Sequence, residues 1–395
     1  MKRKIELLAP AGNPEKLKVA VLYGADAVYL GGKELSLRNA SENFSFREIE
    51  EGVEFAHFHG AKVYVALNAY PEDRDRETID GTLKRLDEIG VDAIIVSSLY
   101  ILRRAAELHC RFGLHVSTQE SVTNRYGIGF FRDYSVSRVI LAREMSLEQI
   151  RRIKENVDVD LEVFIHGAMC CSYSGRCTLS DFFTGRKANR GDCAHPCRWK
   201  YALYREEEET GTLMMGSKDL MALRRLPALI DAGIASLKIE GRMKSLSYLA
   251  HTVKAYRTYL DDIYNETVGK KGKYLAMMEN AVNRETTEGW LKGECTEDDL
   301  IGESSSTPVQ NYLGLILDYD FVSKTALIAL KNPFSVGKEI EVFSYDTENR
   351  SFVVEEILDP ENRAVPIADN TFFRYRIKVP FPVKSFEMLM KKAVR

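Results

Sequence analysis

The sequence lacks the short motifs that mark several enzyme classes. It contains no H-E-x-x-H segment and no G-x-S-x-G segment, the patterns of many zinc peptidases and of α/β-hydrolases. Gly31 and Gly32 are not followed by a third glycine at the spacing of a dinucleotide-binding loop, so we interpret them as a turn. The close C-x2-C pairs of a zinc ribbon are missing as well. These absences argue against the enzyme and metal-binding classes that those motifs define.

Long apolar runs are also absent. No stretch approaches the roughly 18 apolar residues of a membrane span, and Glu6 and Pro10 interrupt the apolar run after the basic start. Seven cysteines, an odd number, without an export signal favour a reducing compartment, so we expect a cytoplasmic protein with no membrane partner. The net charge of −3 does not indicate a general nucleic-acid binder. Locally, however, Arg176 to Arg205 contains seven Arg or Lys against two Asp.

The first two thirds of the chain alternate short β-rich runs with amphipathic helical patterns. With 395 residues, one large and one small domain are expected. The predicted strands are Ile5 to Ala9, Ala27 to Leu30, Lys62 to Leu67, Ala93 to Val96, Leu114 to Ser117, Arg138 to Leu141, Leu161 to Ile165 and Ser236 to Ile239. Eight repeats predict an α/β fold of the (βα)8 TIM-like type over residues 1–264, with an open doubly wound sheet as the alternative.

The remaining segments have other patterns. A Cys-rich insertion after the seventh strand covers residues 169–217, with a hairpin of Lys200 to Arg205 and Thr212 to Met215 around an acidic turn. A helix is predicted over Lys218 to Ala232. Residues 265–307 are interpreted as a helical and polar connector. Residues 308–395 contain short strands between turn residues and no Cys or His, which predicts a small all-β domain resembling a barrel or a sandwich.

Five of the seven cysteines lie within 28 residues, from Cys170 to Cys197. Counting from Cys170 through Cys177 and Cys193 to Cys197, the intervals are six, fifteen and three residues. Buried free thiols are the alternative, but a polar loop that follows a strand is better suited to hold a metal than to fill a core. Four thiolates suit either zinc or an iron–sulfur cluster, and the spacing does not decide between them.

The same segment carries a family signature. Its residues are Glu162-x-Phe164-x-x-Gly167-Ala168-Met169-Cys170, followed by Gly175-x-Cys177-x-Leu179-Ser180. This pattern resembles the one that defines the peptidase U32 family. Asn189 to Cys193 and Cys197-Arg198-Trp199-x-Tyr201 are similar to the tRNA hydroxylation branch of that family. The resemblance extends to LLAPAGNPEKL, YGADAVYLGG and LKIEGRMKS, and so covers nearly the whole chain.

Active sites of (βα)8 barrels lie at the carboxyl ends of the strands, on the same rim from which the cysteine loop leaves strand seven. The residues selected there as candidates are Asn68, Gln119, Arg143, His166, Glu240 and Arg242. Arg143 and Arg242 either bind a substrate carboxylate as forks or pair with their neighbours Glu144 and Glu240. His166 is a candidate for proton transfer, although packing is the commoner role for a histidine there, and His195 is expected to face solvent.

The resemblance implies an oxygen-independent hydroxylase with a [4Fe-4S] cluster. That branch forms 5-hydroxyuridine at the wobble position of tRNA with prephenate, a small dicarboxylate, as hydroxyl donor; other members act on rRNA or on quinone precursors. The implied cluster ligands are Cys170, Cys177, Cys193 and Cys197, with Cys171 outside the ligand set. Glu240 and His166 would move protons, and Arg143, Arg242, Asn68 and Gln119 would bind substrate. A peptidase with Cys170 or Cys171 as nucleophile is the alternative, but it leaves the other cysteines unexplained.

Overall fold

The computed structural model describes residues 4–33, 43–188, 193–269, 272–278, 281, 284–302 and 311–392. The chain forms two compact units. One contains residues 1–278 and 282–306, and the other contains residues 279–281 and 307–395. Over the described residues, no helix is both long and apolar enough to span a bilayer.

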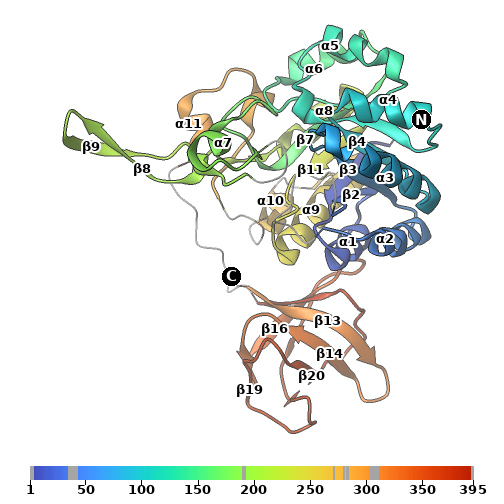
Figure 1. Ribbon diagram of the computed structural model, residues 1–395. Coiled ribbons are helices and arrows are strands. Elements are labelled where there is room, and N and C mark those ends of the chain that lie inside the picture. The colour runs from blue at the N-terminus through green and yellow to red at the C-terminus, as the bar shows by residue number, and fades with distance from the viewer. Residues whose placement is uncertain are drawn as a thin grey trace. The chain divides into compact units, whose positions relative to one another are not determined.

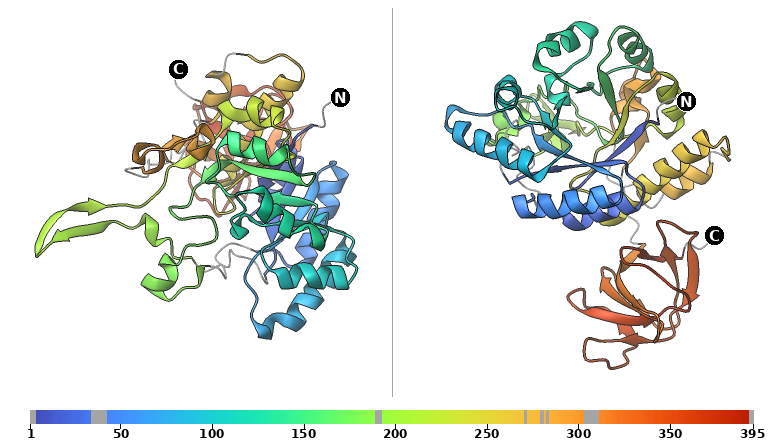
Figure 2. Two further views of the ribbon diagram at one scale, coloured as in Figure 1. Left: turned by 90° about the horizontal axis from the view of Figure 1, so that it is seen from above. Right: turned by 90° about the vertical axis from the view of Figure 1, so that its right-hand side faces the viewer.

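The first unit is a closed barrel of parallel strands (Figures 1 and 2). Its strands are β1 (Glu6–Pro10), β2 (Ala27–Gly31), β3 (Lys62–Leu67), β4 (Ala93–Val96), β5 (Gly113–Val116), β6 (Arg138–Ile140), β7 (Asp160–Ala168) and β11 (Ser236–Ile239). β11 pairs in parallel with both β1 and β7, with Ser236 opposite Glu6 and Glu162. This double pairing closes the sheet and confirms the predicted barrel. The strands are rich in buried apolar residues because both faces of a parallel sheet are covered.

Helices surround the barrel, as the right-hand view of Figure 2 shows. They are α1 (Pro14–Leu22), α2 (Phe46–Phe58), α3 (Arg76–Ile89), α4 (Leu99–Glu107), α5 (Arg125–Phe130), α6 (Leu147–Lys154), α8 (Leu226–Asp231) and α9 (Leu246–Tyr264), with short 3-10 turns η1 (Asp73–Asp75), η2 (Thr118–Glu120), η3 (Arg132–Tyr134) and η6 (Leu223–Arg225). Ser45 and Glu48 form a capping box at the start of α2. Ser146 and Gln149 cap α6 in the same way.

The helix predicted over Lys218 to Ala232 is wrong in its first part. Asp219–Met221 forms strand β10, which pairs antiparallel with the end of β7, and only Leu226–Asp231 is α-helical. β12 (Thr286–Thr287) extends this pairing from the other side of β10. A three-residue strand has no periodicity that a sequence pattern could reveal, and its conformation follows from the neighbouring strand edge.

The cysteine segment contains α7 (Leu179–Thr184), η5 (Pro196–Arg198) and a hairpin of β8 (Tyr201–Arg205) and β9 (Glu208–Leu213). The hairpin reaches away from the barrel (Figures 1 and 2). Its second strand begins at Glu208 rather than at Thr212, because Glu206 adopts a left-handed conformation that permits a tight turn. The described part of the connector contains α10 (Gly272–Met278), η7 (Gly289–Lys292) and α11 (Glu297–Leu300).

The second unit is all-β, as predicted. Its strands are β13 (Tyr312–Asp320), β14 (Thr325–Leu330), β15 (Phe334–Ser335), β16 (Glu339–Phe343), β17 (Arg350–Val353), β18 (Ile357–Leu358), β19 (Ile367–Ala368), β20 (Arg374–Lys378) and β21 (Met388–Lys391). Seven of them form an antiparallel sheet in the order β17-β16-β21-β13-β14-β20-β18, and β15 pairs with β19. Alternate residues of β14 and β20, such as Ile328 and Ile377, point into one hydrophobic core.

Candidate active site

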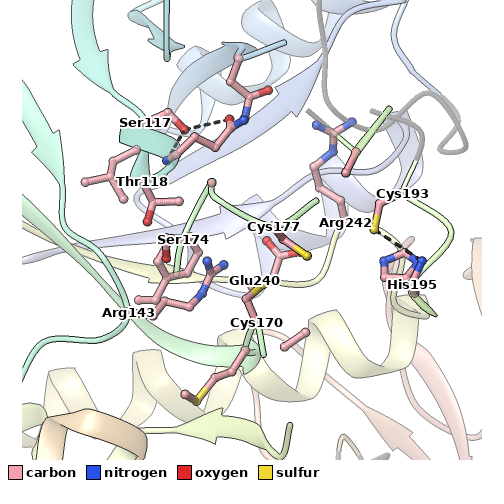
Figure 3. A pocket seen from close by; sticks show the side chains of 18 of the residues that line it. Ser117, Thr118, Arg143, Cys170, Ser174, Cys177, Cys193, His195, Glu240 and Arg242 are labelled. Carbon is pink, nitrogen blue, oxygen red and sulfur yellow. Dashed lines mark hydrogen bonds between the residues drawn. The ribbon is translucent and has the colours of Figure 1, made fainter. Parts of the chain in front are cut away.

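A cavity of about 320 Å³ lies at the carboxyl ends of the barrel strands. Nine of the ten residues selected from the sequence line it: Asn68, Gln119, Arg143, Cys170, Cys177, Cys193, Cys197, Glu240 and Arg242. Figure 3 shows most of these side chains gathered around one space. They come from positions just after β3, β5, β6, β7 and β11, and from the cysteine loop. The tertiary fold therefore brings the rim residues and the cysteine loop to a single site.

The cysteine loop is fastened to the rim by short polar contacts. The backbone N–H of Ser174 donates to Oε1 of Glu144 at 2.7 Å, and its hydroxyl donates to the same oxygen at 3.1 Å. The Ser121 hydroxyl donates to the Ser174 carbonyl. Gly175 has a φ of +77°, and a Cβ there would lie 2.1 Å from the carbonyl oxygen of Gln119. Only glycine permits this close approach, which explains Gly175 in the signature.

Gly167, another glycine of the signature, has a similar role at the end of β7. Its φ is +100°, and a Cβ would lie 2.4 Å from the carbonyl oxygen of Glu240. The backbone N–H of Glu240 donates to the His166 carbonyl at 2.8 Å. These contacts hold the segment after β11 against β7, so Glu240 is fixed at the cavity wall. Its Oε2 accepts a hydrogen bond of 3.0 Å from the Tyr29 hydroxyl.

Among the described residues, Arg143 does not pair with Glu144, which was the alternative interpretation for this arginine. Glu144 is engaged by Ser174, and the Arg143 guanidinium instead lies 3.6 Å from the ring centroid of Phe164. Within the described ranges, Arg143 makes no ion pair. Nη2 of Arg242 donates to Oδ1 of Asn43 at 2.8 Å. A guanidinium stacked on a ring keeps its N–H groups at the ring edge, where they can bind a planar anion.

The thiols of the site influence one another. Hydrogen bonding from the Cys171 thiol lowers the pKa of Cys170 to about 6 and the pKa of Cys197 to about 7. The same contacts raise the pKa of Cys171. Burial raises the pKa of Cys177. Cys171 is not among the residues that line the cavity, and its place outside the ligand set stays a prediction.

The four cysteines of the cavity are the candidate ligands of the expected [4Fe-4S] cluster. In the part of the chain that the structure describes, no group of three or more His, Cys, Asp or Glu side chains is arranged to hold a single metal ion. A [4Fe-4S] cluster has a different requirement, since each of its four irons takes one thiolate. Cys170, Cys177, Cys193 and Cys197 line one cavity, so the donor chemistry fits such a cluster. Asn189 to Asp192 of the signature lie outside the described residues.

A buried charge network lies inside the barrel and reaches the floor of the cavity through Lys238. Lys238 Nζ lies 2.8 Å from Glu162 Oε1, and Arg138 Nη1 lies 3.1 Å from Glu162 Oε2 and 2.6 Å from Glu6 Oε1. Burial alone would raise the pKa of Glu162, but Lys238 and Arg138 lower it to about 2. Burial lowers the pKa of Lys238, which also lies 4.4 Å from the Tyr29 ring centroid. A cation is thus held at the floor by a fully ionised carboxylate.

Two histidines lie at or near the site, and only His195 is placed differently from expectation. His166 is 4% exposed and is not among the residues that line the cavity; its ring packs edge-on against Tyr256 at 5.6 Å. The Tyr256 hydroxyl lies 3.3 Å from Nδ1 of His166, and burial lowers the pKa of His166 to about 4. Its role in proton transfer stays a prediction, and this placement favours packing. His195 lines the cavity and is partly buried, whereas it was expected to face solvent; its backbone is left-handed, with a φ of +55°.

Lys238 and Tyr29 are cavity residues that were not selected from the sequence. Lys238 lies in β11, two positions before Glu240, which follows the end of the strand, and both residues line the cavity. A lysine inside an otherwise apolar barrel strand is the signal that could have identified it. Tyr29 gives no such signal, because tyrosine is common in strands.

Together, the closed barrel and the thiol-lined cavity at its carboxyl rim define a (βα)8 enzyme class with a cysteine loop over the active site. Residues 12–300 match peptidase family U32, and residues 309–389 match the peptidase family U32 C-terminal domain. The chain therefore belongs to the peptidase U32 family.

Similar curated proteins have names that concern RNA modification. The chain is 38% identical to tRNA hydroxylation protein P1 of Bacillus subtilis, over 98% of this chain and 95% of that protein. It is 32% identical to tRNA hydroxylation protein P of Escherichia coli, over 98% and 97% of the two chains. It is also 41% identical to the Escherichia coli 23S rRNA 5-hydroxycytidine C2501 synthase, over 67% of this chain and 40% of that protein.

Proposed function

We propose that this protein is an RNA hydroxylase that forms 5-hydroxyuridine at the wobble position of tRNA. The observation that carries the proposal is a cavity lined by four cysteines, three arginines and Glu240, in a chain similar over nearly its whole length to tRNA hydroxylation proteins. The related rRNA synthase is named for hydroxylation of a pyrimidine at the same ring position, which supports the reaction type.

The proposed cofactor is a [4Fe-4S] cluster held by Cys170, Cys177, Cys193 and Cys197. When bound, such a cluster supplies one-electron chemistry beside the substrate. Cys171, next to Cys170 in the chain, is proposed to stay outside this ligand set. The proposed hydroxyl donor is prephenate, whose carboxylates Arg143 and Arg242 would bind as forks.

The other lining residues would orient the base and move its proton. Gln119 is 6% exposed, and its Nε2 has no hydrogen-bond partner within the described residues. A buried amide donor without a partner is costly, and a uracil carbonyl oxygen would satisfy it. Asn68 lies on the same wall and offers a second amide. The carboxylate of Glu240, held by Tyr29, would accept the proton that leaves C5 of the base.

The test compares tRNA nucleosides by mass spectrometry from a strain without the gene and without other tRNA uridine hydroxylases. The strain would carry the wild type, Cys193→Ser or the matched control Cys171→Ser. We expect 5-hydroxyuridine-derived nucleosides with the wild type and Cys171→Ser, and their loss with Cys193→Ser. Protein purified without oxygen should be brown and contain about four irons per chain in the first two cases only.

Other outcomes would contradict the proposal in distinct ways. The same level of 5-hydroxyuridine-derived nucleosides in all strains would show that the protein has no role in this tRNA modification. A colourless wild-type protein that contains stoichiometric zinc would show that the metal is not an iron–sulfur cluster. Peptide cleavage that persists after iron removal and depends on one cysteine would favour a peptidase instead.

A further inference from the structure

A cluster of exposed aromatic rings lies beside the cysteine loop. The cluster consists of the exposed Phe182, Phe183 and Trp199 and the half-buried Tyr201, from α7, the end of η5 and the start of β8. The exposed fractions are 83% for Phe182, 46% for Phe183 and 41% for Trp199. Large aromatic side chains this exposed and this close together mark interaction surfaces more often than chance. We refer to these four residues as the aromatic platform.

The rings of the aromatic platform contact one another. Ring centroids are 5.7 Å apart for Phe183 and Tyr201, and 6.4 Å apart for both Phe183–Trp199 and Trp199–Tyr201. Phe182 packs edge-on against Phe183 at 5.2 Å. The Tyr201 hydroxyl donates to the Pro196 carbonyl at 2.7 Å, which fixes its ring. The platform is therefore an ordered surface that joins two segments of the insertion.

The platform is continuous with the mouth of the cavity. Leu179, at the start of α7, and Arg198, directly before Trp199, both line the cavity. Ring contacts between Phe183 and Tyr201 place α7 beside the base of the β8–β9 hairpin. An RNA strand whose target base lies in the cavity would thus have its neighbouring nucleotides at the platform.

The charges around the platform suit a polyanion. Arg186 and Lys187 follow α7, while Arg198 and Lys200 flank Trp199. Lys187 also pairs with Glu72 at 3.1 Å, and Asp181 of α7 contributes one opposing charge. The acidic residues 206–209 are at the far end of the hairpin, where they would repel phosphates. We therefore expect bound RNA to contact only the part of the hairpin next to the aromatic platform.

We propose that the aromatic platform stacks unpaired bases next to the base that enters the cavity. This inference rests on the proposed RNA hydroxylation. An enzyme that acts on a base must take that base out of its stack, which leaves the flanking bases without a partner. Aromatic rings beside basic residues are the usual way in which proteins hold such single-stranded bases. A protein partner is the competing occupant, since Trp, Tyr and Arg also dominate protein interfaces.

The first test measures the affinity of the full chain, purified without oxygen, for a tRNA anticodon stem-loop oligonucleotide. The variants are Phe183→Leu and Trp199→Leu, which keep apolar bulk but remove the ring. Trp199→Tyr keeps a ring, and Phe58→Leu, at the 86% exposed C-terminal end of α2, is the matched surface control. We expect each leucine variant of the platform to lose about tenfold in affinity, and the two controls to bind as the wild type.

A second measurement detects stacking directly. The chain has two tryptophans, so Trp290→Phe leaves Trp199 as the sole indole. We expect the stem-loop to quench its fluorescence, whereas the same oligonucleotide with abasic loop positions, which keeps the phosphates, should not.

The outcomes separate the inference from the function on which it rests. If the wild type binds and hydroxylates RNA while the leucine variants do the same, the platform proposal is wrong and the proposed function stands. If the leucine variants keep RNA affinity but lose association with a second protein, the surface belongs to a protein partner. If the wild type neither binds nor modifies RNA, both proposals fail.

Discussion

Individual charged residues inside the barrel show how one side chain can govern a site. Glu162 is fully buried and pairs with Arg138 inside the barrel and with Lys238, which lines the cavity. Removing one partner of a buried ion pair is far more costly than removing a surface pair, because the remaining charges lose their compensation. Glu162 therefore serves stability as well as the electrostatic environment of the cavity.

We predict that Glu162→Gln lowers the free energy of unfolding by about 3–5 kcal/mol, because Lys238 and Arg138 stay buried without their carboxylate. Urea unfolding of the barrel unit would measure this change. Glu148→Gln is the matched control, since Glu148 pairs with Arg152 on the exposed face of α6 and its loss should change stability by less than about 1 kcal/mol. Equal effects of the two substitutions would show that the network does not act as a buried ion pair.

Among the elements, α9 illustrates burial on nearly every side. Twelve of its 19 residues are buried, including His251. Nδ1 of His251 lies 2.8 Å from the Ser247 carbonyl oxygen, and burial lowers the pKa of His251 to about 4. The unfolded chain would bind this proton near pH 6.5. Acid should therefore weaken the helix packing through this residue.

The sign of the effect follows from the two pKa values. Above about pH 6.5, His251 is neutral in both states and its contribution to stability is complete. Between about pH 6.5 and 4 the unfolded state binds more protons than the folded state, so stability falls as the pH is lowered. We predict that the wild type loses about 3 kcal/mol more than His251→Gln over this window. Urea midpoints of both proteins between pH 7.5 and 4 would measure the difference. Parallel profiles would contradict the buried neutral histidine.

At the scale of the molecule, the chain forms two compact units with separate hydrophobic cores. The second unit has its own antiparallel sheet and a core that includes Ile316, Ile328 and Leu389. A segment with its own core and paired strands meets the requirement for independent folding.

We predict that residues 307–395 fold alone, with dispersed amide resonances and one cooperative urea transition whose slope is smaller than that of the barrel unit. Ile328 is fully buried in β14, so Ile328→Asp should abolish that transition. A fragment without cooperative unfolding would show that its core is insufficient without the barrel.

The sequence by itself determined the repeat pattern, the cysteine spacing and the rim positions. Short apolar strands alternate with capped helices, and the ends of these elements can be identified locally, as at the helix cap Ser45 and at Asn68 and Arg143 after strands. Nine of ten selected residues line the cavity for this reason, since the carboxyl ends of parallel strands meet at one rim.

Only the tertiary structure decided which of those side chains touch one another. His166 packs against Tyr256, 90 positions away, and Glu162 joins Lys238 across 76 positions. The conformation of β10 depends on the free edge of β7, and the aromatic platform depends on the approach of α7 to β8. Such contacts depend on distances between residues far apart in the chain, which no local pattern encodes.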